Sequence, residues 1–372
     1  MIDFFKTYIG WLSYYPFLTI IISFVIGLIT MPYVLKVSIR KQLVVKPNKR
    51  TSHKGNIPNV GGINIFTAFL LSYLLFSFSV DVSDNGRYFL AGLYLIFFVG
   101  FLDDLLSFSA KKKFIGEIFA GFIVIVVANI RLTNLHGFFW ISEIPDNLFI
   151  VSYLSSFFLF FLIINSLNLI DGVDGLATGI GIVICGFFGI YFQLIGELNL
   201  ALMAYSLIGA LALFFIYNVF GKKSKIFMGD SGALVLGYIV YVFVVKFCEV
   251  NKTPPNVKYF MYAAPAMSVC ILAVPLFDTL RVMFTRIKKG YSPFKADKNH
   301  VHHLLLSIGL KHRQVTLILV SVNLSFIALA LIGSQWKNSM LGGAAALLAI
   351  IYTCIMWRVV DKHKKKQQQP IA

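Results

Sequence analysis

Long apolar runs, each long enough to cross a bilayer, restrict most strongly how this chain can fold. About 20 apolar residues cross a ~30 Å hydrocarbon core as a helix, since lipid offers the backbone no hydrogen-bond partner. Such runs with few charges lie at 11–35, 60–80, 88–106, 114–130, 147–169, 175–196, 198–219, 230–246, 259–284, 315–336 and 338–357. Only 13% of the residues are charged, against roughly 25% in soluble domains. The sequence therefore predicts an all-α polytopic membrane protein with about eleven transmembrane helices.

Lysine and arginine are distributed unevenly about these runs. Most of the 33 lie in the loops after the first, third, seventh and ninth runs and in the C-terminal tail. Because positively charged loops stay in the cytoplasm, we expect the N-terminus outside and the C-terminus in the cytoplasm. We expect one integral-membrane catalytic domain over 1–358 and a basic cytoplasmic tail over 359–372. The first run is too long for a cleavable signal peptide, and the net charge of +17 is read as topogenic rather than as a nucleic-acid footprint.

Four polar motifs fall at the cytoplasmic ends of the predicted helices. Asp103 and Asp104 close the third run, and the sequence NSLNLIDGVDG at 165–175 links the fifth and sixth. Asp230 begins the eighth run, and the sequence HVHH at 300–303 follows the ninth. Charged residues at membrane depth are expensive and mark functional sites more often than chance. We therefore expect one site at this face.

The first two motifs exceed what ordinary loop chemistry requires. Asp103 and Asp104 at a helix C-terminus oppose the helix dipole by up to ~1 kcal/mol each, which a metal or a cationic partner would offset. Asp-Gly is a common turn dipeptide, which explains the glycines but not the asparagines. Asn165, Asn168 and Asp171 follow i, i+3 spacing and would line one helix face.

The other two motifs have simpler readings as well. Asp230 fits a helix N-cap, and it fits equally a ligand for a hard cation such as Mg²⁺. The histidines suggest zinc, but no cysteine or well-spaced fourth ligand accompanies them, so phosphate contact is favoured. The four cysteines show no metal-binding spacing. Acids, lysines and histidines together predict Mg²⁺-dependent phosphoryl transfer on a membrane-embedded substrate, with the donor unnamed.

The four motifs, in this order on about eleven spans, resemble the polyprenyl-phosphate N-acetylhexosamine-1-phosphate transferases. The stretch KPNKRTSHKGNIPNVGGI near the N-terminus belongs to the same resemblance. The family includes bacterial transferases that begin O-antigen and other surface-polysaccharide synthesis. It implies that undecaprenyl phosphate attacks the β-phosphorus of a UDP-N-acetylhexosamine, releasing UMP and leaving a polyprenyl-diphospho-sugar. It also implies a bacterial cytoplasmic (inner) membrane location with the active site on the cytoplasmic face.

The resemblance also implies roles for individual residues. Metal ligands would be Asn168 and Asp230, holding Mg²⁺ for which Mn²⁺ substitutes. The implied catalytic residues are Asp103, Asp104, Asp171, His302 and His303. The implied substrate-binding residues are Lys49, Arg50, His53, Lys113, Asn165, Asp174, Phe227 and His300. Within these sets, Phe227 would stack on uracil, Asp174 would lie at the nucleotide, and Asp103 or Asp104 would lie beside the lipid phosphate as a base or as a positioning group.

Some alternatives remain open at this stage. The related phospho-N-acetylmuramoyl-pentapeptide transferases carry three consecutive histidines followed by an acid, whereas Val301 interrupts the run here. A CDP-alcohol phosphotransferase would need an Ala-Arg after Asp171-Gly172. A transporter would place its polar residues near the bilayer midplane, where only Asp278 and Arg281 fall, read as a buried ion pair. Expected partners are a UDP-N-acetylhexosamine, undecaprenyl phosphate and the lipid bilayer, with no nucleic acid and with a homodimer left open.

Overall fold

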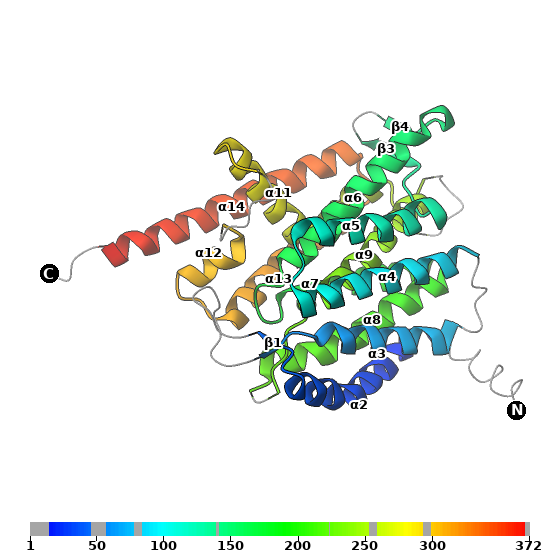
Figure 1. The fold of residues 1–372 in the computed structure, drawn as a ribbon. Helices are drawn as coiled ribbons and strands as arrows, with labels where there is room; N and C mark the ends of the chain where they lie inside the picture. The colour runs from blue at the N-terminus through cyan, green and yellow to red at the C-terminus, as the bar shows by residue number, and fades with distance from the viewer. Residues whose placement is uncertain are drawn as a thin grey trace, which may run out of the picture.

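The computed structural model describes residues 15–45, 57–77, 84–138, 141–222, 224–252, 259–292 and 299–368, which form a bundle of helices (Figure 1). The long helices are α2 (Leu18–Arg40), α3 (Gly61–Phe76), α4 (Asp84–Leu106), α5 (Ala110–Phe122, continued by a π-helical turn Ile123–Val127), α6 (Phe149–Leu169), α7 (Leu176–Leu194), α8 (Leu198–Phe220), α9 (Gly229–Val250), α11 (Ala273–Lys288), α13 (His312–Ile332) and α14 (Asn338–Gln368). The short elements are α10 (Ala264–Ile271), α12 (Val301–Ser307), a 3-10 turn Asp146–Leu148 and strands β1 (Val44–Val45), β2 (Ile57–Pro58), β3 (Asn134–Phe138) and β4 (Ile141–Glu143).

The helices confirm an all-α polytopic membrane protein. Among the described residues, eight helices are long and apolar enough to cross a membrane, and α10 with α11 makes a ninth if the bent pair counts as one span. A helix occupies each of the predicted runs. However, α3 has only 16 residues and α5 only 13. The predicted count of eleven spans is therefore not confirmed, and the orientation of the termini stays a prediction.

Helix α9 is the centre of the bundle. It packs against α3, α4, α6 and α7, and 83% of its membrane-spanning window is buried. A helix that is apolar on all sides belongs inside a bundle, and the large rings of Tyr238, Tyr241, Phe243 and Phe247 fill the space around α9. Its first turn carries Asp230, so this burial holds that carboxylate at a rigid position.

Helices α10 and α11 are a pair bent by 82° at the break between them. Pro275 in the first turn of α11 has no N–H to donate, which interrupts the helical hydrogen bonds at this point. Asn323 of α13 satisfies the freed backbone groups: its Oδ1 accepts from Val274 N at 3.1 Å, and its Nδ2 donates to Ile271 O at 3.0 Å. Non-helical backbone at membrane depth requires such buried partners. The break turns α11 toward α6 and toward the end of the bundle that carries the polar motifs.

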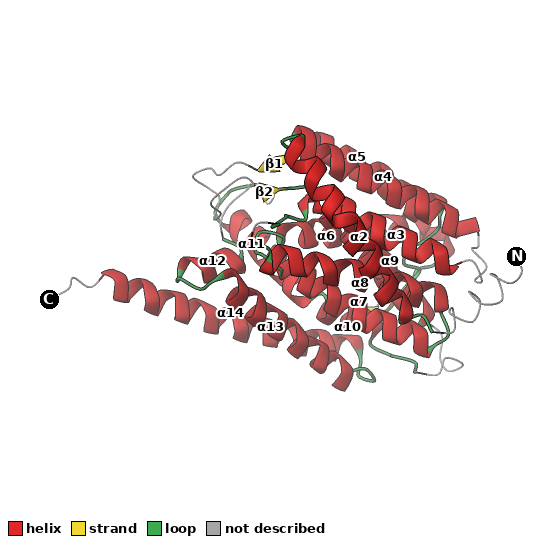
Figure 2. Ribbon diagram, turned by 90° about the horizontal axis from the view of Figure 1, so that it is seen from below, coloured by secondary structure: helices red, strands yellow, loops and turns green. Residues whose placement is uncertain are grey.

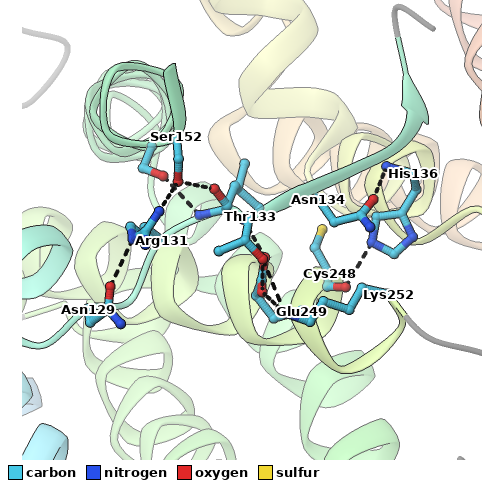
Figure 3. Close-up of polar contacts among 11 residues, drawn as sticks. Asn129, Arg131, Thr133, Asn134, His136, Ser152, Cys248, Glu249 and Lys252 are labelled. Carbon is cyan, nitrogen blue, oxygen red and sulfur yellow. Dashed lines mark hydrogen bonds and ion pairs between the residues drawn. The ribbon is translucent and has the colours of Figure 1, made fainter. Parts of the chain in front are cut away.

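The two ends of the bundle are closed differently. At one end, β1 and β2 pair antiparallel, with Val44 opposite Pro58, and α14 projects beyond the other helices (Figure 2). At the opposite end, the β3–β4 hairpin is tied to the last turn of α9 (Figure 3). There Glu249 accepts hydrogen bonds from the Thr133 backbone N–H at 2.6 Å and hydroxyl at 2.7 Å. All four polar motifs lie at the end marked by β1 and β2, as the contacts in the next section show.

Candidate active site

Asp104, near the C-terminus of α4, binds the first turn of α9. Its Oδ1 accepts from Asp230 N at 2.7 Å, and its Oδ2 accepts from Ser231 N at 3.0 Å and from Ser231 Oγ at 2.7 Å. The Asn59 amide adds a fourth hydrogen bond at 3.1 Å. Helix α9 begins at Gly229 with Met228 as its N-cap residue, so Asp230 lies within the first turn and the N-cap reading of that residue is wrong. The cap comes from Asp104 of another helix and satisfies N–H groups that would otherwise lack partners.

Asp230 is paired by residues from two further helices. Its Oδ1 accepts from Lys113 Nζ of α5 at 2.5 Å and from Asn168 Nδ2 of α6 at 2.5 Å. The same Lys113 ammonium lies 3.5 Å from Asp103 Oδ2. Lys113 is therefore a cation held between two carboxylates. Asp103 is also held by a backbone hydrogen bond, since its Oδ1 accepts from Phe108 N at 2.7 Å. Lys113 is a cationic partner of Asp103, and the neutral backbone amides of α9 donate to Asp104.

Glycines allow these elements to approach closely. Gly229 has φ +72°, and a Cβ there would lie 2.5 Å from Asn59 O and 2.6 Å from an Asp104 oxygen. Gly62 lies in the first turn of α3, and a Cβ on it would collide with the backbone N of Gly232. The backbone of Gly62 donates to Met228 O at 2.8 Å. The glycine pair 61–62 of the N-terminal motif thus supports the turn that precedes Asp230.

Asp171 lies in the turn between α6 and α7, and no described residue donates a hydrogen bond to its carboxylate. Burial raises its pKa well above the ordinary value, and the neighbouring carboxylates of Asp230, Asp104 and Asp174 raise it further. Several acids with few cations cannot all be ionised at such short range unless positive charge is added. This crowding favours a site that takes up a cation.

Asp174, three residues further on, is in contrast fully paired. Burial opposes its ionisation, but His312 and Lys225 outweigh that effect and hold the pKa of Asp174 below its ordinary range. Lys225 Nζ lies 2.6 Å and His312 Nδ1 3.0 Å from Asp174 Oδ2. Asn218 of α8 accepts from Gly175 N at 2.6 Å and donates to Ile226 O at 2.8 Å. The Asp-Gly turn is therefore tied to the loop before α9.

Phe227 stands in that loop with its ring half-buried. The Lys225 ammonium lies 5.7 Å from the ring centroid, a cation–π distance. Phe227 N donates to Pro58 O at 2.8 Å, and Phe227 O accepts from Gly61 N at 2.9 Å. The backbone is thereby fixed on both sides, and the ring lies on the Asp174 side of the site, next to Lys225.

The histidine motif reaches the site from α12. A Cβ on Gly172 would lie 2.8 Å from His302 Nε2, so His302 packs on the Asp-Gly turn. The rings of His302 and His303 are 4.3 Å apart, and those of His300 and His302 are 5.7 Å apart and nearly parallel. Burial, with the repulsion of the neighbouring His303, lowers the pKa of His302 to about 3. His302 is therefore a neutral imidazole at pH 7.

The buried neutral His302 predicts an acid-sensitive fold. An unfolded histidine has a pKa near ~6.5, so between about pH 6.5 and pH 3 the unfolded chain binds a proton that the folded chain refuses. Stability therefore falls as the pH falls through this window, by up to about 2 kcal/mol between pH 7 and 5. His302→Gln is expected to flatten this dependence. Thermal unfolding in detergent at pH 7, 6 and 5 measures it, and equal slopes for the two proteins would contradict it.

The structure brings most of the sequence-predicted residues to one end of the bundle. Asp103, Asp104, Lys113, Asn168 and Asp230 form one connected group. Asp171, Asp174, Phe227, His302 and His303 lie beside it, as described above. Lys49, Arg50 and His53 lie outside the described residues.

Other residues take part that the sequence had not singled out. One is Glu117 of α5, which is only 2% exposed and whose Oε2 lies 3.3 Å from Asn165 Nδ2. Lys225, His312 and Asn59 also contact site carboxylates. Lys225 and His312 stand among ordinary basic loop residues in the sequence. In the sequence, Glu117 could have been noticed only as an acidic residue inside the largely apolar run 114–130.

The residues around Asp230 suit Mg²⁺. Mg²⁺ takes carboxylate, carbonyl and water oxygens and uses few protein ligands, and Asp230 with the Asn168 amide offers such oxygens once that amide turns its oxygen inward. The Lys113 ammonium, 2.5 Å from Asp230, shows that this position stabilises positive charge. No cluster of three or more His, Cys, Asp or Glu in metal-binding arrangement occurs in the described part of the chain. The fit is to a cation shared with substrate phosphates rather than to a closed protein cage.

Acids, a lysine and histidines at one end of an apolar helix bundle are suited to hold a diphosphate at a membrane surface. Comparison with known proteins agrees: the model of glycosyl transferase family 4 matches residues 87–248. The undecaprenyl-phosphate alpha-N-acetylglucosaminyl 1-phosphate transferase of Yersinia pestis is 33% identical over 300 residues, 80% of this chain and 78% of that protein. The protein of the same name from Escherichia coli O157:H7 is 30% identical over 300 residues, 80% and 77% of the two chains. A probable undecaprenyl-phosphate N-acetylglucosaminyl 1-phosphate transferase of Bacillus subtilis is 28% identical over 325 residues, 84% of each chain.

The chain therefore belongs to the polyprenyl-phosphate N-acetylhexosamine-1-phosphate transferase family. The matched region 87–248 contains the two aspartates of α4, Lys113, the 165–175 motif and Asp230. The histidine motif follows it. The resemblance drawn from the sequence is thus confirmed.

Proposed function

We propose that this protein transfers an N-acetylhexosamine 1-phosphate from a UDP-sugar to undecaprenyl phosphate, releasing UMP. The single observation that carries the proposal is the group formed by Asp103, Lys113, Asn168 and Asp230 at one end of the bundle. The names of the curated relatives support undecaprenyl phosphate as the acceptor and N-acetylglucosamine 1-phosphate as the transferred group. The product would be a polyprenyl-diphospho-sugar for cell-surface polysaccharide synthesis.

In the proposed reaction, an oxygen of the lipid phosphate forms a bond to the β-phosphorus of the UDP-sugar. The bond from that phosphorus to the bridging oxygen breaks, and the electron pair leaves with UMP. A phosphate monoester has its second pKa near ~6, so the attacking oxygen needs little deprotonation. A single in-line displacement then requires charge neutralisation and positioning rather than a covalent enzyme intermediate.

The protein's own side chains supply that positioning. Lys113, with its neighbours on α5, would neutralise phosphate oxygens, and Asp103 beside it would orient the lipid phosphate. The half-buried Phe227 ring offers a stacking face for the uracil, with Asp174 nearby. His302, as a neutral imidazole, and the neighbouring His303 would form hydrogen bonds with phosphate or sugar oxygens.

We include Mg²⁺ in the proposal, with Asn168 and Asp230 as its ligands and Mn²⁺ as a substitute. When bound, the cation would neutralise the diphosphate charge and polarise the phosphoryl oxygens. The basic loops at the motif end support a cytoplasmic active site in a bacterial inner membrane, since positive loops are retained there. The UDP-sugar is a soluble cytoplasmic metabolite class, which suits this orientation.

Purified protein in detergent is expected to release UMP from UDP-N-acetylglucosamine only when undecaprenyl phosphate and Mg²⁺ are both present. Excess EDTA should lower the rate by at least about 100-fold, because removing one electrostatic stabiliser of a transition state costs 10²–10³ in rate, and Mn²⁺ should restore it. UMP release and formation of the lipid-linked sugar are measured together. Equal or faster turnover of UDP-N-acetylmuramoyl-pentapeptide would refute the proposed donor class, and UMP release without acceptor would refute the reaction.

A further inference from the structure

Asp278 of α11 is a buried carboxylate that the proposed reaction does not use. Its side chain is 4% exposed and accepts hydrogen bonds from three groups. Arg281 Nη2 donates to Oδ1 at 2.8 Å, and the Val301 N–H donates to Oδ1 at 3.0 Å. His300 Nδ1 lies 2.9 Å from Oδ2. The ion pair expected from the sequence is confirmed, and the histidine contact is additional.

The contact with His300 determines which nitrogen of that ring carries a proton. An ionised carboxylate only accepts hydrogen bonds, so the hydrogen between Asp278 and His300 belongs to Nδ1. In a neutral imidazole the second nitrogen, Nε2, is then an acceptor. The His300 side chain is itself only 4% exposed, so its ring cannot exchange this partner for bulk water. A carboxylate behind a histidine is the usual device for holding one tautomer.

The same carboxylate holds the backbone of the histidine motif. The Val301 N–H that it accepts begins α12, and Arg281 Nη2 donates to Asn299 O at 2.6 Å. Residues 299–301 are thus attached to α11 on both sides of His300. His300 stacks on His302 at 5.7 Å, and His302 packs on Gly172 of the Asp-Gly turn. Displacement of His300 would therefore move the ring that contacts the site.

The other polar side chains that line the adjoining cavity among the described residues, Tyr352 and Thr353, are paired elsewhere, with Ser325 and with Ala349 O. A cavity of about 100 Å³ lies between α11, α13 and α14, and Asp278 and Arg281 stand at its polar part. The rest of its described lining is mostly aliphatic and aromatic, for example Val274, Phe277 and Phe326. Free apolar space beside the carboxylate leaves His300 and Val301 dependent on this one acceptor.

We propose that Asp278 is a positioning residue, which keeps His300 protonated on Nδ1 and keeps the histidine motif seated against the Asp-Gly turn. Only the expected effect on turnover rests on the proposed function. The geometry itself can be tested without any substrate. Asp278 touches no reacting atom, so its effect is transmitted through His300 and His302.

The test compares two near-isosteric substitutions in adjacent positions of α11. Asp278→Asn keeps an acceptor for the Val301 N–H but turns an amide N–H₂ toward His300, so Nδ1 must accept and the proton moves to Nε2. We expect kcat to fall about 30-fold, with KM for the UDP-sugar changed less than about threefold. Thr279→Val is the matched control, because the Thr279 hydroxyl is buried without a hydrogen-bond partner. The control is expected to retain the wild-type kcat and thermal stability.

The tautomer is read directly by ¹⁵N NMR on protein labelled at histidine, with His300→Gln identifying the signal. Wild-type His300 is expected to carry its proton on Nδ1 and Asp278→Asn to carry it on Nε2, while Asp278→Glu, which restores a carboxylate, should recover part of kcat. A wild-type His300 protonated only on Nε2 overturns the proposal, even where Asp278→Asn fails to fold. Wild-type kcat in a folded Asp278→Asn also overturns it. A correct tautomer in a protein without transferase activity would instead contradict the proposed function alone.

Discussion

Asp230→Asn is expected to lower kcat at least 10³-fold, a loss of about 4 kcal/mol of transition-state stabilisation, while the protein keeps its fold. The carboxylate accepts from both Lys113 and Asn168 at 2.5 Å, so it joins the proposed cation site to the lysine proposed to contact phosphate. A neutral amide would still accept a hydrogen bond but, without the negative charge, would stabilise a divalent cation much less. The substitution also relieves repulsion with Asp103 and Asp171, so the unfolding temperature should change little.

One further measurement and one control variant sharpen this prediction. Binding of Mn²⁺, followed by electron paramagnetic resonance, should weaken at least tenfold in Asp230→Asn. Asp361→Asn, an exposed aspartate on α14, removes the same charge away from the site and should retain wild-type turnover and Mn²⁺ binding. Full activity in Asp230→Asn would remove this residue from the metal site.

Asp104→Asn is expected to reduce both turnover and stability. Asp104 accepts four hydrogen bonds, three of them from Asp230 N, Ser231 N and Ser231 Oγ. In an asparagine, one of the two accepting oxygens is replaced by an N–H₂ group, which cannot accept from the N–H donors of α9. At least one of these donors would then be buried without an acceptor, which costs about 1–3 kcal/mol. The first turn of α9 would shift, and kcat should fall at least about 100-fold because a displacement near 1 Å at a catalytic group has this effect.

Thermal unfolding and turnover measured on the same samples separate the two aspartates. Asp104→Asn should unfold at a clearly lower temperature than wild type, whereas Asp230→Asn should not. Asn59→Ala is the matched control at the same contact. It removes one of the four donors to Asp104 and should cost less stability than Asp104→Asn. An Asp104→Asn protein with wild-type stability would mean that this carboxylate does not hold α9, and a direct role at the lipid phosphate would then be favoured.

The membrane character and the site composition were predictable because they depend on local patterns. Apolar length is read along the chain, and the alternating loops place the motifs on one face without knowledge of which helices touch. The i, i+3 spacing of Asn165, Asn168 and Asp171 anticipated a polar helix face, although only Asn168 contacts Asp230. Asn165 instead contacts Glu117. Residues three apart on an α-helix point in directions that differ by about 60° around the helix axis, so Asn165 and Asn168 reach different neighbours.

Contacts between residues that are far apart in the chain were not predictable in the same way. The sequence pattern presents Asp230 as its own helix cap, but the cap is Asp104 from α4, 126 residues away in the chain. Lys225 and His312 resemble ordinary cytoplasmic-loop residues, yet both contact Asp174. The count of eleven spans is not confirmed: among the described residues eight or nine spans are long and apolar enough, because apolar runs measure composition and not where a helix begins and ends.

From the amino acids alone follow an apolar helical bundle, one polar end and a chemistry of carboxylates with phosphate, since hydropathy and residue type act locally. Which carboxylate holds a helix, which holds a cation and which holds a histidine follows only from the packed molecule. Asp104, Asp230 and Asp278 are chemically identical side chains. They differ because α4, α9 and α11 bring different donors to each: backbone amides, an ammonium with an amide, and an imidazole with a guanidinium. Hydrogen bonds between residues far apart in the chain depend on helix packing, and no local pattern encodes them.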